Sequence, residues 1–163
     1  MFSKLVPIPS SAMIPDRDIG KSPILECVNL GITFGGLKAV EDFDLTNADA
    51  VMDALRAYAP DAIIHCAAYT NVEKAESMPE VCADVNGMGT LNMVRAALAV
   101  QAKLMYISTD YLSEGPWDQA YEVNDPIAPQ SVYGLTKAQG EEAVLSLMQR
   151  YFIVRISWVF GEN

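Results

Sequence analysis

The sequence predicts an α/β protein built as a partial doubly wound parallel sheet. From residue 44 onward, segments with apolar residues at helical spacing alternate with short continuous apolar runs. The short runs have the length of strands and are bounded by polar or proline-containing turns. This alternation of helix and strand is typical of parallel sheets covered by their crossover helices.

The elements are expected in the order helix, strand, helix, strand, loop, helix, strand. Thr46 and Asn47 are N-cap residue types ahead of ADAVMDALRAYA, and Pro60 with Asp61 ends that helix. The run AIIHCAA is typical of a strand buried on both faces, and a loop with a short helix follows it. The remaining elements are helices in GTLNMVRAALAVQA and SVYGLTKAQGEEAVLSLMQR, strands in KLMYIST and YFIVRISWVF, and a polar loop over 110–129.

Composition and charge exclude several classes of function. The 163 residues, 51% hydrophobic and 20% charged, are typical of one soluble globular domain with a real core. No apolar run approaches the roughly 18 residues of a membrane helix, and the first residues lack the apolar core of a signal peptide. The net charge of −10, without a basic cluster, argues against a nucleic-acid partner.

The cysteines point to a reducing compartment. Cys27, Cys66 and Cys82 are odd in number and have no paired spacing, so we expect free thiols in a cytoplasmic protein. His65 stands beside Cys66, but neighbours on a strand point to opposite faces and are poor co-ligands. We therefore expect packing roles for both residues and no metal site.

Polar residues follow the expected strands, in AAYT (67–70), STDY (108–111) and SWVF (157–160). Ligands of doubly wound sheets bind beyond the carboxyl ends of the strands. Tyr133 and Lys137, four residues apart at the expected start of the third helix, share one helical face. The pair alone also arises by chance, since the chain has seven tyrosines. With the hydroxyls of STD, however, it has the arrangement of short-chain dehydrogenases.

In that arrangement a hydroxyl and a phenol hold a substrate carbonyl. The lysine lowers the pKa of the phenol, so that a proton can be donated near neutral pH. Residues 44–163 resemble, more narrowly, the Rossmann-like, NAD(P)-binding reductases that make dTDP-L-rhamnose from its 4-keto precursor. The resemblance rests, in family order and spacing, on DAIIHCAAYTNVEKAE, VNGMGTLNM, KLMYISTDY, VYGLTKAQGEE and VRISWVFGEN.

The resemblance implies hydride transfer from NADPH or NADH to C4 of dTDP-4-dehydro-L-rhamnose, with Tyr133 giving the proton. It implies three groups of site residues: a catalytic set of Thr109, Tyr133 and Lys137; cofactor contacts at Ala68, Tyr69, Thr70, Tyr133 and Lys137; and sugar contacts at Thr109, Asp110, Tyr111 and Trp158. Asn86 matches a family asparagine that braces the site. A homodimer is a further expectation.

Each of these residues also has a plainer interpretation when taken singly. Thr109 would cap a strand, Tyr133 would be a surface aromatic, and Lys137 would be a solvated helix charge. A core or interface role for Trp158 is as well supported as sugar contact. Three nearby charged residues are interpreted as a solvated face, namely Glu73, Lys74 and Glu76.

The resemblance breaks before residue 44. A dinucleotide-binding fold opens with a glycine-rich turn that lets the backbone approach the pyrophosphate, and the glycines at 31, 35 and 36 do not match it. Residues 24–45 instead resemble the opening of ABC transporter ATP-binding subunits of the branched-chain amino-acid group. The phosphate loop of that family does not follow, and the earlier stretch PDRDIGKS lacks its first glycine.

We therefore interpret the chain as a hybrid with a seam near residues 42–46: a tail over 1–23, two short ABC-like strands over 24–43, and a truncated reductase domain over 44–163. The first glycine-rich βαβ unit and the C-terminal substrate part of the family are both expected to be missing. Loss of the first strand would leave AIIHCAA as an exposed apolar edge, and activity would be impaired. The alternatives are a non-catalytic module on the same fold and, with much weaker support, an ABC ATP-binding segment.

Overall fold

The structure, a computed structural model, describes residues 43–113 and 121–157. The expected tail and nearly all of the expected ABC-like strands lie outside these residues. The helices are α1 (Ala48–Tyr58), α2 (Val72–Ser77), α3 (Pro79–Ala83), α4 (Gly89–Ala99) and α5 (Val132–Leu147), with a π-helical turn η2 (Asp84–Met88) and a 3₁₀ turn η3 (Asp110–Leu112). The strands are β1 (Ala62–His65), β2 (Lys103–Thr109) and β3 (Tyr151–Ile156).

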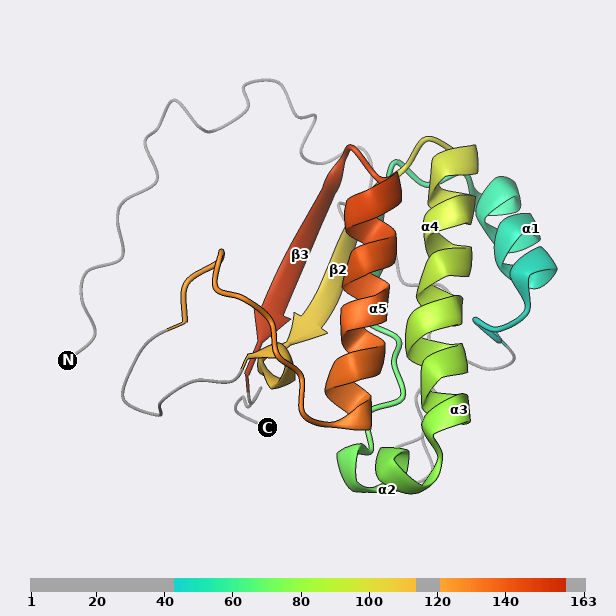
Figure 1. The fold of residues 1–163 in the computed structure, drawn as a ribbon. Helices are drawn as coiled ribbons and strands as arrows, with labels where there is room; N and C mark the ends of the chain where they lie inside the picture. Colours follow the sequence, from blue (N-terminus) through green and yellow to red (C-terminus); the bar gives the residue numbers. More distant parts are fainter. Residues whose placement is uncertain (1–42, 114–120, 158–163) are drawn as a thin grey trace, which may run out of the picture. The chain divides into compact units, whose positions relative to one another are not determined.

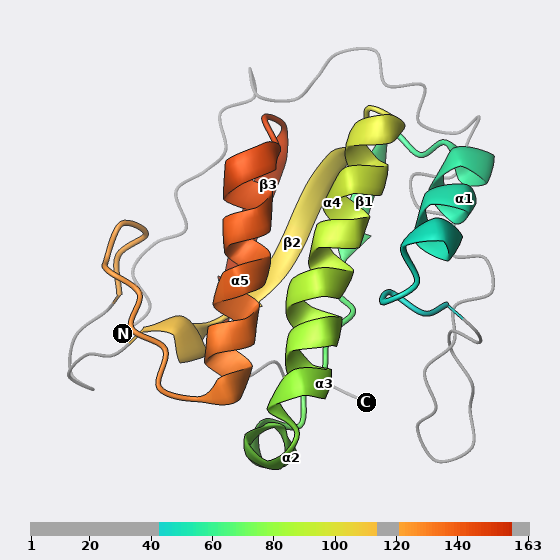
Figure 2. The same ribbon diagram turned by 45° about the vertical axis from the view of Figure 1, so that its right-hand side comes forward.

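The strands form a parallel sheet in the order β1-β2-β3, which confirms the predicted fold class. Ile63 of β1 pairs with Leu104 of β2, and Ser108 of β2 pairs with Arg155 of β3. Helices α1, α4 and α5 lie side by side over one face of this sheet (Figures 1 and 2). Within the described residues β1 pairs with β2 alone, so it is an edge strand, as expected for a fold without its first strand.

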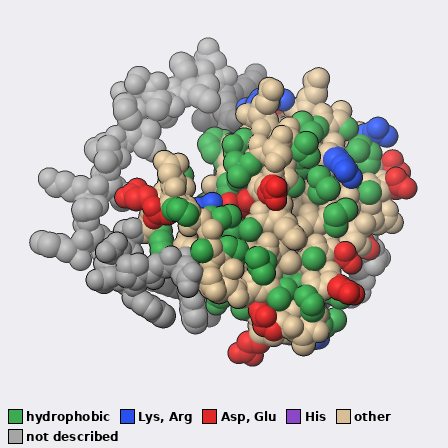
Figure 3. Space-filling model, viewed as in Figure 1, with side chains coloured by type: hydrophobic (Ala, Val, Ile, Leu, Met, Phe, Trp, Pro, Cys, Tyr) green, Lys and Arg blue, Asp and Glu red, His purple; other side chains and the backbone are tan. Residues whose placement is uncertain are grey.

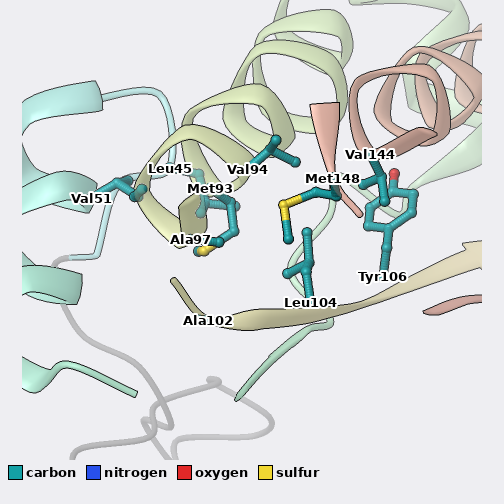
Figure 4. Close-up of a cluster of buried hydrophobic side chains, with 11 residues drawn as sticks. Leu45, Val51, Met93, Val94, Ala97, Ala102, Leu104, Tyr106, Val144 and Met148 are labelled. Atoms are coloured by element: carbon teal, nitrogen blue, oxygen red, sulfur yellow. The ribbon is translucent and has the colours of Figure 1, made fainter. Parts of the chain in front are cut away.

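The hydrophobic core lies between the sheet and these helices (Figure 4). Leu104 and Tyr106 of β2 are fully buried beneath Val94 of α4 and Val144 of α5. The other members of the cluster are Leu45, Val51, Met93, Ala96, Ala97, Ala102 and Met148. Burying this apolar surface is the main favourable contribution to folding, and it fixes α5 against β2.

Side-chain caps set the helix starts. Asn47 accepts from the Ala50 amide at 3.1 Å, which confirms the predicted cap of α1, and Ser131 accepts from the Gly134 amide of α5 at 3.0 Å. Glu76 of α2 adds a second cap to α5, accepting from the Val132 amide at 2.8 Å. The interpretation of Glu76 as part of a solvated face therefore misses a contact 56 residues away in sequence.

The prediction that AIIHCAA is a strand buried on both faces is wrong in two respects. The strand ends at His65, and Ile64 is 55% exposed. Its exposed face continues across the sheet through Phe152, Val154 and Ile156. The reason is that the described helices cover only the opposite face of the sheet (Figures 1 and 2).

The helix-bearing side of the molecule shows hydrophobic side chains scattered among acidic and basic ones (Figure 3). Exposed leucines contribute to this surface, at Leu98 of α4 and at Leu135, Leu145 and Leu147 of α5. In the part of the chain that the structure describes, no helix combines the length and apolar character needed to cross a membrane.

Candidate active site

A cavity of about 280 Å³ opens at the carboxyl ends of the strands. This is where a doubly wound sheet binds its ligands. The cavity brings together most of the site residues predicted from the sequence, namely Ala68, Thr70, Thr109, Asp110, Tyr111, Tyr133 and Lys137. Its remaining lining residues are Cys66, Val72, Ile107, Ser108, Ile156 and Ser157.

Thr109 is the last residue of β2 and is 5% exposed. Its extended backbone makes it the N-cap of η3, and its hydroxyl oxygen accepts from the Tyr111 amide at 3.3 Å. The same hydroxyl donates to the Asp110 carboxylate at 3.2 Å. The expected capping role of Thr109 therefore exists alongside its position in the cavity wall.

Tyr133 stands in the first turn of α5, half-buried in the cavity wall. The following residue must be small, because a Cβ on Gly134 would lie 2.6 Å from the Tyr111 carbonyl oxygen. The rings of Tyr111 and Tyr133 meet edge to face, 5.6 Å apart. The glycine thus lets the start of α5 approach η3 and bring the phenol of Tyr133 close to Thr109.

Burial raises the pKa of the Tyr133 phenol, a hydrogen bond with Thr109 lowers it, and the nearby Asp110 raises it further. The net direction is upward. This differs from the prediction that the neighbouring lysine lowers the phenol pKa. The physical reason is that the ammonium of Lys137 points elsewhere, and desolvation of the phenol dominates.

Lys137 lies one turn further along α5 and is only 2% exposed. Its Nζ donates to the Ile107 carbonyl oxygen at 2.7 Å and lies 4.0 Å from the centre of the Tyr106 ring. Burial lowers the pKa of this amine to about 8, against the opposing effects of Glu141 and Cys66. The interpretation of Lys137 as a solvated helix charge is therefore excluded.

Asn86 braces the cavity from the π-helical turn η2, where it is 1% exposed. Its Oδ1 accepts from the Tyr69 amide at 2.7 Å, and its Nδ2 lies 3.2 Å from the Tyr69 carbonyl oxygen. The same amide nitrogen contacts Cys82 Sγ at 3.3 Å and Thr136 Oγ1 at 3.1 Å. One side chain therefore ties the loop after β1 to α3 and α5.

Tyr69 is the predicted cofactor contact whose side chain does not line the cavity. Its hydroxyl contacts Met78 Sδ at 3.9 Å, while its backbone is held by Asn86. Trp158, the predicted sugar contact, lies outside the described residues. Ser108 and Ser157 belong to the selected motifs STDY and SWVF but were not given a role of their own. The expected packing role of Cys66 is wrong, because its side chain is exposed and lines the cavity. Among the described residues, no group of three or more His, Cys, Asp or Glu side chains could hold a metal ion.

The model of one protein family, described as the RmlD substrate binding domain, matches residues 25–163 of the chain. The match therefore includes most of the segment at 24–45 on which the ABC resemblance rests. It also includes the expected seam near residues 42–46 and all of the motifs that line the cavity.

Two of the curated relatives that match the chain share one name, dTDP-4-dehydrorhamnose reductase. The dTDP-4-dehydrorhamnose reductase of Streptomyces griseus is 40% identical over 119 residues, and that of Mycolicibacterium smegmatis is 43% identical over 118. Both alignments cover 72% of this chain, but only 39% and 36% of the two relatives. The chain thus spans less than half the length of the curated relatives that it matches.

A crystal structure of dTDP-4-dehydrorhamnose reductase from Bacillus anthracis, in complex with NADP, is similar with a TM-score of 0.71. It is 40% identical in sequence, and the alignment covers 74% of this chain and 43% of that one. The structural similarity thus extends over most of this chain but less than half of that protein.

Proposed function

The chain belongs to the family described as the RmlD substrate binding domain, and on this basis we propose that it carries the catalytic end of a nucleotide-sugar reductase. The substrate is dTDP-4-dehydro-L-rhamnose, its C4 ketone is reduced, and the cofactor is NADPH or NADH. The names of the relatives support the choice of sugar, and the NADP complex of the Bacillus anthracis enzyme supports the choice of cofactor. The reductase part is residues 44–163, and the compact unit that contains it begins at Phe43.

One observation carries the proposal: a single cavity gathers a buried hydroxyl, a phenol and a buried ammonium at the carboxyl ends of the strands. Thr109, Tyr133 and Lys137 come from β2 and from the first two turns of α5. Separately each has a plain structural explanation. Together in one cavity they form an acid–base site for a carbonyl substrate.

In this site Tyr133 donates the proton that the ketone oxygen needs when it becomes an alcohol. Its raised pKa keeps the phenol protonated near neutral pH and therefore able to donate. The Thr109 hydroxyl orients the phenol and the substrate oxygen. Lys137, with a pKa of about 8, is mostly charged at neutral pH, and the Ile107 carbonyl holds its ammonium in the cavity wall.

The nicotinamide end of the cofactor fits the residues present. Lys137 would donate to its ribose, and Ala68 and Thr70, which line the same cavity, would hold the nicotinamide end with it. The bound cofactor supplies the hydride. Every described glycine lies within a helix, at Gly87, Gly89, Gly134 and Gly140, so none of them forms a strand-to-helix turn for the pyrophosphate.

Cofactor binding can be tested without activity by thiol labelling. Cys66 is exposed and lines the cavity, whereas Cys82 is fully buried and serves as the internal control. We expect saturating NADPH to slow alkylation of Cys66 by iodoacetamide about tenfold or more while Cys82 stays unreactive, as measured by peptide mass spectrometry. Equal Cys66 labelling with and without NADPH would contradict cofactor binding in this cavity.

Tyr133→Phe tests the chemical role. We expect the rate of 4-keto sugar reduction to fall at least about a hundredfold, with NADPH affinity retained, because the ring stays and only the donor proton is lost. Tyr58→Phe is the matched control, since Tyr58 is 60% exposed on α1. A wild-type chain that binds NADPH but turns over no 4-keto sugar would favour the non-catalytic module.

We also propose a cytoplasmic location and a homodimer. The free thiols of Cys66 and Cys82 support the first. Exposed leucines on neighbouring helices, Leu98 of α4 and Leu145 of α5, support the second. Light scattering on the purified chain decides the second, and a monomer at micromolar concentration would exclude it.

A further inference from the structure

An ion pair between a buried carboxylate and a partly exposed arginine lies next to the proposed site and takes no part in the chemistry described above. Glu141 of α5 is 1% exposed, and both of its carboxylate oxygens accept from Arg155 of β3. Nε lies 2.9 Å from one oxygen and Nη2 lies 2.7 Å from the other. This fork geometry is the strongest form of the arginine–carboxylate contact. A carboxylate so deeply buried needs such a partner to offset the loss of its hydration.

The pair joins the two walls of the cavity. Glu141 follows Lys137 by one helical turn, so both side chains extend from the same face of α5 toward the sheet. Arg155 directly precedes Ile156 and Ser157, which line the cavity on the β3 side. The ion pair therefore links the helix that carries Tyr133 and Lys137 to the strand opposite it.

The carboxylate also acts on the lysine through its charge. The ammonium of Lys137 is buried, with one hydrogen bond to a backbone carbonyl and one ring face beside it. Burial lowers the pKa of Lys137, and Glu141 is the larger of the two opposing influences, ahead of Cys66. Titratable or charged groups surround Lys137 on several elements. The strands and the turn after β1 contribute His65, Cys66, Tyr106 and Arg155, and α5 contributes Tyr133 and Glu141, which is paired with Arg155.

We propose that the Glu141–Arg155 pair is the positioning pair of this site: Glu141 holds Lys137 as an inward-directed ammonium, and Arg155 locks Glu141 and α5 to β3. This inference rests on the proposed function for the ligand that Lys137 meets. Neither residue touches the reacting atoms. Both act through Lys137 and through the spacing of the cavity walls.

Glu141→Gln removes the charge and keeps the shape of the side chain. Competitive labelling with acetic anhydride, read by mass spectrometry of the Lys137 peptide, measures the protonation of Lys137 directly. We expect a wild-type labelling midpoint at about pH 8 and a midpoint about one pH unit lower in Glu141→Gln. Glu142→Gln is the matched control, since Glu142 is the exposed neighbour on the same helix, and its midpoint should equal that of wild type.

The direction of the shift separates this role from a purely structural one. A loosened site would admit water to Lys137, relieve its burial and raise the midpoint toward the ordinary value of 10.5. An unchanged or raised midpoint in Glu141→Gln would therefore overturn the inference. If that variant does not fold, Glu141→Met with Arg155→Met leaves no unpaired charge. It should still lower the midpoint, because the charge of Glu141 raises the pKa of Lys137.

NADPH titration of the same variants links the pair to function. We expect Glu141→Gln to bind NADPH about fivefold more weakly than wild type at about pH 8, and Glu142→Gln to bind equally well. If wild type binds NADPH and Glu141→Gln binds it equally well, this inference is overturned and the proposed function is not. A wild-type chain that binds no NADPH would overturn the proposed function, and the labelling midpoints would still decide whether Glu141 controls Lys137.

Discussion

The two faces of the sheet differ sharply in how their side chains are held. On the face covered by α1, α4 and α5, Leu104 and Tyr106 are fully buried. Met105 lies between them in the strand and points to the other face. Its neighbours on the adjacent strands are Ile64, which is 55% exposed, and Phe152, which is 65% exposed. Composition does not explain the contrast, because both faces are apolar. The contrast arises because the described helices α1, α4 and α5 all cover the same face of the sheet.

The proposed chemistry depends on the covered face. Lys137 and Glu141 extend from the helix that packs there, and Tyr106 supplies the ring beside the ammonium. Close packing excludes water, so charges on this face act on one another strongly. The cavity itself also uses Ile107 and Ile156, which belong to the open face. The site therefore lies where a well-packed face meets an open one.

Truncating one large side chain on each face tests the contrast most strongly. We expect Leu104→Ala to lower the free energy of unfolding by about 3 kcal/mol, because it removes a fully buried side chain and leaves a cavity. Phe152→Ala should cost less than about 1 kcal/mol, since its ring is mostly in water. Urea denaturation measures both. Equal costs would mean that the open face is covered in the folded chain.

Gly140→Ala tests how closely α5 approaches the covered face. A Cβ at this position would lie 2.8 Å from Cζ of Tyr106 and 3.0 Å from the Asn86 carbonyl oxygen. We expect a loss of about 2 kcal/mol in urea denaturation, as overpacking outweighs the better helix propensity of alanine. Ser146→Ala, at an exposed position of the same helix, is the control. A gain of about 1 kcal/mol in Gly140→Ala would show that no tight contact exists.

The pH dependence of stability reports on His65 of the covered face. Burial, and then the charge of Lys137, lower its pKa from 6.5 to about 4. Below pH 6.5 the unfolded chain binds a proton that the folded chain does not, so stability falls as the pH falls toward 4. We expect a loss of about 1 kcal/mol between about pH 6.5 and 5.5.

His65→Gln should remove that part of the slope, whatever its effect at neutral pH. The comparison uses urea denaturation of both chains at the two pH values. The interval lies above the ordinary pKa of carboxylates, so their contribution is small. An identical slope in the two chains would mean that water reaches His65 and that the covered face is more open than its packing indicates.

Much of the fold could be predicted from the sequence because its signals are local. Apolar periodicity identified the main helices and strands, and β2 has the predicted bounds, 103–109. Asn47 caps α1 as predicted, since a cap depends on residues within one turn. The motifs also predicted the gathering of Thr109, Tyr133 and Lys137 in one cavity, because parallel strands all end at one edge.

Long-range contacts could not be predicted in this way. Three such contacts join residues that are well separated in the chain. They are the cap that Glu76 provides to α5, the hydrogen bond from Lys137 to Ile107, and the ion pair between Glu141 and Arg155. The predicted effect of Lys137 on the phenol assumed an ammonium aimed at Tyr133. The fold instead directs it to a carbonyl and a ring.

The sequence by itself determined the order of helices and strands, the parallel sheet and most of the residues that line the cavity, because periodicity, caps and motifs depend on near neighbours. Only the tertiary structure decided which sheet face is covered, where the ammonium of Lys137 points and in which direction the pKa of Tyr133 moves. These properties depend on desolvation and on charges brought together across the fold, and no local pattern of residues specifies them.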